Sequence, residues 1–243
     1  MDKDRETKMA LQNAQYNVAA PNSLPVRVAG HQRRRMFESF LAYSAPGPNE
    51  TILDVGATSD QSYSHSNYLE AWYPHKSCIT AVGIDDASFL ERLYPGLRFV
   101  PADGRDLPFS DGAFDHVHSS AVLEHVGSQP NQAKFLRELW RVTRKTLFVT
   151  TPNRGFPIEF HTVLPLIHWL PPASFRAVLR RTGRGFFAEE ENLNLMMRGD
   201  LQRAAAAAGI RGAEVRSLSL LGWPSNLLLV ARKEPGPLGD MTQ

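Results

Sequence analysis

Cysteine is almost missing from this 243-residue chain, in which Cys78 is the single example. One cysteine can form no intramolecular disulfide and can supply no thiolate cluster for a metal ion. The shortage is consistent with a reducing compartment, and we expect a cytoplasmic protein. We also expect no metal site, because His116 and His118 alternate along one predicted strand and no further ligand set converges on them.

Long apolar runs and an excess of one charge are missing as well. The longest apolar stretch, residues 163–172, is interrupted by prolines and a histidine, and it falls well short of the ~20 residues that span a bilayer. The N-terminus is charged and no apolar segment follows it, so we expect no secretory signal. A net charge of +2 gives no general reason to expect nucleic acid as a partner.

The composition that remains is that of a globular protein, with 42% hydrophobic and 21% charged residues, and the chain is long enough to bury a large core. Short apolar runs alternate with segments of helical periodicity. Strands are predicted at 51–56, 79–84, 97–100, 114–119 and 146–151, and helices at 31–43, 66–72, 88–93 and 131–144. This alternation predicts an α/β fold with a parallel sheet covered on both faces.

The end of the chain follows a different pattern. A helix at 201–208 is followed by strands at 213–220 and 227–232, joined through residues 222–226. No helix fits in that gap, so the two strands should be antiparallel. We expect residues 1–28 to form a loose arm and residues 29–243 a single domain, with 153–200 as an insertion that covers the substrate at the carboxyl edge of the sheet.

Three predicted strands end in residues suited to a nucleotide-like ligand. The first ends at Asp54 and Gly56, and a glycine lets the backbone turn tightly and approach a ligand. The second ends in Asp85, which could accept from both hydroxyls of a ribose. The third leads to Asp103 and Gly104, where a carboxylate could accept from an amine such as that of adenine. Each feature has a structural alternative, namely a glycine turn or a surface acid.

A set of motifs in a fixed order connects these residues. The sequence reads L-D-V-G at 53–56, G-I-D at 83–85, L-P-F-S-D-G-A-F-D-H-V at 107–117 and V-L-E-H-V at 122–126, with Asp103 between the second and third. Over residues 50–151 this combination resembles the class I S-adenosylmethionine-dependent methyltransferases, in particular the type 11 small-molecule subgroup. The resemblance implies a Rossmann-like, seven-stranded, mostly parallel sheet with a C-terminal antiparallel hairpin, and S-adenosyl-L-methionine as cofactor.

The resemblance also assigns roles by position. It places Asp54 and Gly56 in the loop that binds the methionine part, Asp85 on the ribose hydroxyls with Asp86 as second candidate, and Asp103 on the adenine amine. The predicted cofactor-binding residues are Asp54, Gly56, Ala57, Thr58, Asp85, Asp86, Asp103, Gly104, Ser119 and Ser120.

One position in the first loop departs from the family pattern. The family usually has glycine two and four residues after Gly56, where this chain has Thr58 and Asp60. Asp60 could attract the ammonium group of the methionine part, or the loop could be reshaped. The departure leaves open a protein that binds the cofactor without catalysis.

The candidate catalytic residues are His125, Glu159 and His161. An oxygen acceptor must lose its proton during methyl transfer, and histidine is well suited to accept it. His125 follows the fourth strand, beside the expected methyl group, whereas Glu159 and His161 follow the fifth. The structural alternatives are a His125 that only orients its neighbours and a Glu159–His161 pair that only stabilises the insertion.

The rest of the insertion has two features of interest. Residues 163–170 could form a lid over an apolar substrate, contact a membrane surface, or simply pack as the core of the insertion. The basic group Arg176, Arg180, Arg181 and Arg184 could meet a phosphate or anionic lipid, or could be a solvated helix face.

We therefore expect an enzyme that transfers a methyl group from S-adenosylmethionine to a small-molecule acceptor, first at oxygen, then at nitrogen, with carbon also open. The substrate could be apolar or anionic, peripheral membrane contact stays an alternative, and the oligomeric state is not predicted. The alternatives are a non-catalytic cofactor-binding protein and an NAD-dependent oxidoreductase. The terminal hairpin and the L-E-H motif argue against the oxidoreductase.

Overall fold

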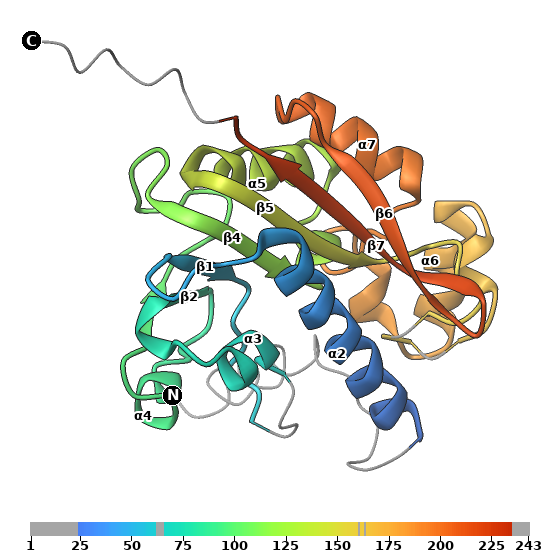
Figure 1. Cartoon of the computed structure of the whole chain (residues 1–243). Coiled ribbons are helices and arrows are strands. Elements are labelled where there is room, and N and C mark those ends of the chain that lie inside the picture. The colour runs from blue at the N-terminus through green and yellow to red at the C-terminus, as the bar shows by residue number, and fades with distance from the viewer. Residues whose placement is uncertain (1–23, 62–65, 160, 163, 235–243) are drawn as a thin grey trace, which may run out of the picture.

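The computed structural model describes residues 24–61, 66–159, 161–162 and 164–234. Its centre is a seven-stranded sheet with the order β3-β2-β1-β4-β5-β7-β6 (Figure 1). The strands are β1 (Ile52–Val55), β2 (Ile79–Gly83), β3 (Arg98–Pro101), β4 (Phe114–Ser120), β5 (Thr143–Pro152), β6 (Glu214–Leu220) and β7 (Trp223–Arg232). The first five are parallel, and β7 pairs antiparallel with both β5 and β6. The predicted fold class is confirmed.

Helices cover both faces of the sheet. The helices α2 (Leu24–Ser44), α3 (Tyr68–Trp72) and α4 (Phe89–Leu93) pack on one face, and α5 (Gln129–Val142) and α7 (Arg198–Ala207) pack on the other (Figure 1). Side chains along β1 alternate between the two faces of the sheet. Ile52 packs in the core under α2, α3 and α4, and Leu53 and Val55 pack in the core under α5 and α7. Asp54 therefore points to the same face as Ile52.

Two boundaries differ from the sequence prediction. Helix α2 begins at Leu24, so residues 24–28, which we assigned to a loose arm, are helical; residues 1–23 lie outside the described part. The terminal hairpin turns through Leu221 and Gly222, with φ of 51° and 82°, and β7 starts at Trp223 rather than at residue 227. Two consecutive positive φ angles are typical of the two-residue turn that matches the twist of paired strands.

The segment between β5 and α7 contains helix α6 (Pro172–Arg181) and the short 3₁₀ helices η4 (Ile167–Trp169) and η5 (Gly185–Ala188). It buries a small core of its own, made of Phe175, Leu179, Phe187, Ala188 and Leu193. A parallel bridge between Asn153 and Met196 joins its two ends. The segment lies beyond the end of β5 and beside the turn of the hairpin (Figure 1). Residues 198–200, included in the predicted insertion, are the first turn of α7.

Candidate active site

Gly56 makes the turn at the end of β1. Its φ is 117°, and the backbone N–H groups of Gly56 and Ala57 both donate to the carbonyl of Val82, each at 2.8 Å. A Cβ atom on Gly56 would lie 2.0 Å from Cγ2 of Val122, which follows β4. Glycine is needed here because the segment after β4 packs directly against the turn.

Asp54 belongs to a buried polar network that the sequence motifs did not reveal. Its Oδ1 lies 2.5 Å from Nδ1 of His118, whose Nε2 lies 2.9 Å from the hydroxyl of Tyr68. Glu70 is also fully buried, and neither of its carboxyl oxygens has a hydrogen-bond partner in the part of the chain that the structure describes. Burial raises the pKa of Asp54 to about 6 and lowers the pKa of His118 to about 4. Burial and the charge of Asp54 together raise the pKa of Glu70 well above its usual range.

Thr58 and Asp60, which replace family glycines, take part in hydrogen bonds within their loop. The backbone N–H of Thr58 donates to the side chain of Asn67 at 2.8 Å, and the Asn67 amide donates back to the Thr58 carbonyl at 2.9 Å. The Thr58 hydroxyl accepts from the N–H of Asp60, and the Asp60 carboxylate accepts from Ser66. These contacts tie the described part of the loop to Asn67 and Ser66. An attraction of Asp60 for the ammonium group and a reshaped loop both stay predictions.

The two acids after β2 are held differently. Oδ1 of Asp86 accepts from the backbone N–H of Ser88 at 2.9 Å, just before α4, and this bond lowers the pKa of Asp86. Asp85 is half-buried at the end of β2. The carboxylate of Asp86 thus already holds the start of a helix. The assignment of Asp85 to the ribose stays a prediction.

Asp103 is engaged by a neighbour that the motif did not include. Its carboxylate accepts from Nε of Arg105 at 3.0 Å and from Nη2 at 2.6 Å, and this pairing lowers the pKa of Asp103. An adenine amine would have to share the carboxylate with Arg105. A Cβ on the adjacent Gly104 would lie 2.4 Å from the ring of Phe135, so this glycine permits close packing of α5.

The two serines at the end of β4 have different surroundings. Ser119 is fully buried, and its hydroxyl donates to the carbonyl of Val55 at 2.7 Å, which joins β4 to β1. Ser120 bonds to the hydroxyl of Thr150 at 2.9 Å. Ser120 also lines a cavity of about 50 Å³, together with Asp54, Gly56 and His118. Of the two, Ser120 is the one that reaches the predicted cofactor edge.

The three candidate catalytic residues come together. His125, in the 3₁₀ helix η3 (Leu123–His125), places its Nε2 3.1 Å from Nε2 of His161, and Nδ1 of His161 lies 2.7 Å from Oε1 of Glu159. Glu124, which the motif contained but to which we assigned no role, is fully buried beside them. Its Oε2 accepts from Thr151 at 2.9 Å, and its Oε1 has no hydrogen-bond partner among the described residues.

Burial and pairing shift the protonation of this cluster in different directions. Burial and the nearby His161 lower the pKa of His125 to about 3. Burial alone would lower the pKa of His161, but the hydrogen bond and charge of Glu159 raise it above its usual value. Burial alone would raise the pKa of Glu159, but His161 and the Thr162 amide hold it at about 2. His161 is therefore the stronger base of the two imidazoles.

Two further features of the insertion can be compared with the predictions. Leu164 and Ile167 pack on its small core, while Leu166, Trp169 and Leu170 are each more than 40% exposed; Val163 lies outside the described residues. Arg176 and Arg180 pair with Glu190 and Glu189 at 3.8 and 3.2 Å. Partnered surface arginines favour the solvated-face interpretation over a phosphate site.

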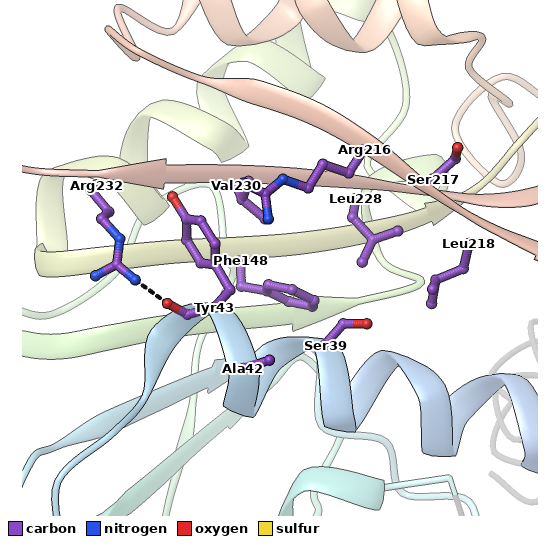
Figure 2. A pocket seen from close by; sticks show the side chains of 10 residues that line it. All are labelled: Ser39, Ala42, Tyr43, Phe148, Arg216, Ser217, Leu218, Leu228, Val230 and Arg232. Carbon is purple, nitrogen blue, oxygen red and sulfur yellow. Dashed lines mark hydrogen bonds between the residues drawn. The ribbon is translucent and has the colours of Figure 1, made fainter.

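A larger cavity lies elsewhere, between α2 and the terminal hairpin. Its volume is about 430 Å³, and the side chains of Arg216 and Arg232 lie on either side of the Tyr43 ring, 5.2 and 4.7 Å from its centroid (Figure 2). Its lining includes none of the predicted cofactor or catalytic residues. We therefore locate the active site by the strand ends and not by cavity size.

Comparison with known proteins agrees with this geometry. Residues 53–148 match a family model described as a methyltransferase domain. Tocopherol O-methyltransferase from Arabidopsis thaliana is 30% identical over 135 residues, which are 50% of this chain and 37% of that protein. An uncharacterized methyltransferase from Mycolicibacterium gilvum is 33% identical over 124 residues, which are 51% of this chain and 42% of that protein. The chain thus covers less than half the length of either curated relative.

Solved structures with the same fold include magnesium protoporphyrin IX methyltransferase from Synechocystis, determined with bound SAH. It aligns with a TM-score of 0.56 and 16% identity, over 96% of this chain and 97% of that one. This likeness shows that the chain has the fold of that methyltransferase, and residues 53–148 in addition match the methyltransferase-domain model. None of the described helices is long and apolar enough to cross a membrane.

Proposed function

We propose that this protein transfers a methyl group from S-adenosylmethionine to an oxygen of a small-molecule acceptor. The methyltransferase domain supports the donor, and the cluster of His125, His161 and Glu159 supports the acceptor atom. The observation that carries the proposal is the pair of Nε2 atoms 3.1 Å apart, next to the end of β4. Nitrogen is the second candidate for the acceptor atom, because an amine can also react after losing a proton.

In this proposal the acceptor hydroxyl gives its proton to an imidazole Nε2. Its oxygen then bonds to the methyl carbon while the bond from sulfur to that carbon breaks, and the electron pair stays on sulfur. Glu159 would hold Nδ1–H of His161, so that Nε2 is the basic atom. The rest of the rate would come from placing acceptor and methyl group in line.

The residues of the donor side form the second part of the proposal. Asp85 would hold the ribose, Gly56, Ala57 and Thr58 the methionine part, and Asp103 with Gly104 the adenine. The insertion would cover the acceptor, and its exposed side chains Leu166, Trp169 and Leu170 make an apolar acceptor the favoured class. The antiparallel β5-β7-β6 arrangement favours methyl transfer over the NAD-dependent alternative.

Calorimetry with S-adenosylmethionine and S-adenosylhomocysteine tests the donor side. Replacing Asp85 by alanine should weaken binding about 10- to 100-fold, which corresponds to loss of charge-assisted hydrogen bonds of about 1.5–3 kcal/mol. Asp86→Ala is the matched control and should leave the affinity near that of the wild type. No binding by the wild-type protein would contradict the proposal, and an unchanged affinity in Asp85→Ala would remove Asp85 from the ribose site.

Mass spectrometry of metabolite extracts incubated with protein and cofactor tests the acceptor side. The expected result is a small molecule that gains one methyl group at oxygen. A cofactor that binds without any methylated product would favour the non-catalytic alternative.

A further inference from the structure

The imidazoles of His125 and His161 are each held by their Nδ1 atoms. Nδ1 of His125 lies 2.6 Å from the backbone carbonyl of Asn192, which can only accept, so this nitrogen carries the hydrogen. Nδ1 of His161 faces Oε1 of Glu159, whose two oxygens already accept from the backbone N–H groups of His161 and Thr162. In both neutral rings the lone pair is therefore on Nε2.

The two Nε2 atoms thus direct lone pairs at one another across 3.1 Å. Two lone pairs at this distance repel each other unless a positive centre lies between or beside them. Oε1 of Glu124 points to the same place, 3.9 Å from Nε2 of His125, and this fully buried oxygen has no hydrogen-bond partner among the described residues. A buried carboxylate oxygen without a partner is costly, so a cation is the occupant that all three atoms favour.

We propose that Glu124, His125 and His161 form a three-ligand site for a divalent transition-metal ion, with Zn²⁺ as the best fit and the fourth position open. The three ligand atoms all lie within 4.8 Å of one another. In a tetrahedral site with ligand distances of ~2.0–2.1 Å, neighbouring ligand atoms are about 3.3 Å apart. Two of the three separations are 3.1 and 3.9 Å and the third is within 4.8 Å, so the side chain of Glu124 must rotate toward the imidazoles to complete the site.

The surroundings of the three ligands are those of a metal site. Each ligand is held from behind by a hydrogen bond: His125 by the Asn192 carbonyl, His161 by Glu159, and Glu124 by the Thr151 hydroxyl. Such bonds fix the ring tautomer and the orientation of the ligand atoms. The imidazole side chains are 13% and 12% exposed, which leaves an approach for a fourth ligand. Imidazole ligands exclude Mg²⁺ as the preferred ion.

The ion would change how the acceptor loses its proton, and this part of the inference rests on the proposed function. An acceptor oxygen in the fourth position would ionise more readily next to the ion and would release its proton to water. The two imidazoles would then serve as ligands in the metal-bound protein instead of accepting the proton themselves. Metal binding itself does not depend on the proposed function, because it is measured without cofactor or acceptor.

Titration of the untagged, chelator-treated full chain with Zn²⁺, and with Co²⁺ as a spectroscopic probe, tests the site. We expect one ion per chain and the intense visible absorption of four-coordinate Co²⁺. His161→Gln and Glu124→Gln should each weaken binding at least tenfold, and Glu159→Gln about 10- to 100-fold through the orientation of His161. His75→Ala, which removes an exposed histidine outside the cluster, is the control and should bind as the wild type does.

Circular dichroism of each variant verifies folding, and the partly exposed His161 keeps the test usable if Glu124→Gln fails to fold. Absence of Co²⁺ absorption in the wild type would overturn the inference, and so would a loss of metal affinity in His75→Ala equal to that in the cluster variants. The positive centre between the two Nε2 atoms would then be a shared proton. If S-adenosylmethionine binds and methyl transfer proceeds without the ion site, the proposed function stands alone. If the ion binds but S-adenosylmethionine does not, the site stands and the proposed function fails.

Discussion

Gly56→Ala should destabilise the protein through two separable effects. The φ of 117° is a conformation that costs a non-glycine residue about 1–3 kcal/mol. The new Cβ would also lie 2.0 Å from Cγ2 of Val122, where ordinary contacts are 3.4–4 Å, and such overpacking costs about 1–3 kcal/mol. Together they predict a loss of about 2–6 kcal/mol, measured as a lower urea midpoint at an unchanged m-value.

A double-mutant cycle with Val122→Ala separates the two effects. Alanine at 122 removes the clashing methyl group, so Gly56→Ala should cost about 1–3 kcal/mol less in that background than in the wild type. The strain in φ should remain in both backgrounds. If the two substitutions add within about 0.5 kcal/mol, the segment after β4 does not press on this turn, and the argument from close packing is refuted.

Three other substitutions test single physical causes. Gly222→Ala meets no atom of the described residues within 4 Å, apart from its chain neighbours, but keeps a φ of 82°. It should therefore cost about 1 kcal/mol of unfolding free energy from conformation alone, and a larger loss would refute that reasoning. Gly104→Ala has the opposite cause, because its Cβ would lie 2.4 Å from the Phe135 ring and 2.8 Å from Val55. It should cost about 1–3 kcal/mol of unfolding free energy, and less than that in a Phe135→Leu background. Glu50 has a pKa lowered to about 2 by the Gly47 amide, Lys145 and His116, so its stabilisation is complete above pH ~4.5 and is lost as pH falls toward 2. Glu50→Gln should reduce the loss of unfolding free energy between pH ~4.5 and 2 by about 2 kcal/mol, measured by urea titrations at several pH values. An unchanged loss in the variant would show that Glu50 does not cause it.

The sequence predicted the parallel strands well because their signals are local. Strands β1 and β2, for example, are short apolar runs that end at Gly56 and Gly83. The hairpin turn was placed too late because Pro224 and Asn226 are typical turn residues, whereas Leu221 is not. In the structure Leu221 adopts a positive φ and is almost fully exposed, while Asn226 pairs within the sheet.

The site was predictable in part for the same reason. His125, Glu159 and His161 stand near predicted strand ends, which is why they could be grouped without knowing the contacts. The partnership of Asp54 with His118 depends on the β1–β4 register, which sets them side by side although they are 64 residues apart. The unpartnered oxygen of Glu124 depends on which side chains surround it, and no spacing in the sequence carries that information.

The position of β7 has a consequence for synthesis of the chain. This strand is the last of the described strands in sequence, yet it lies inside the sheet, between β5 and β6 (Figure 1). Until Trp223–Arg232 has left the ribosome, β5 exposes an open edge to other nascent chains. The pairing of β7 with β5 thus sets the point in synthesis at which this edge is covered.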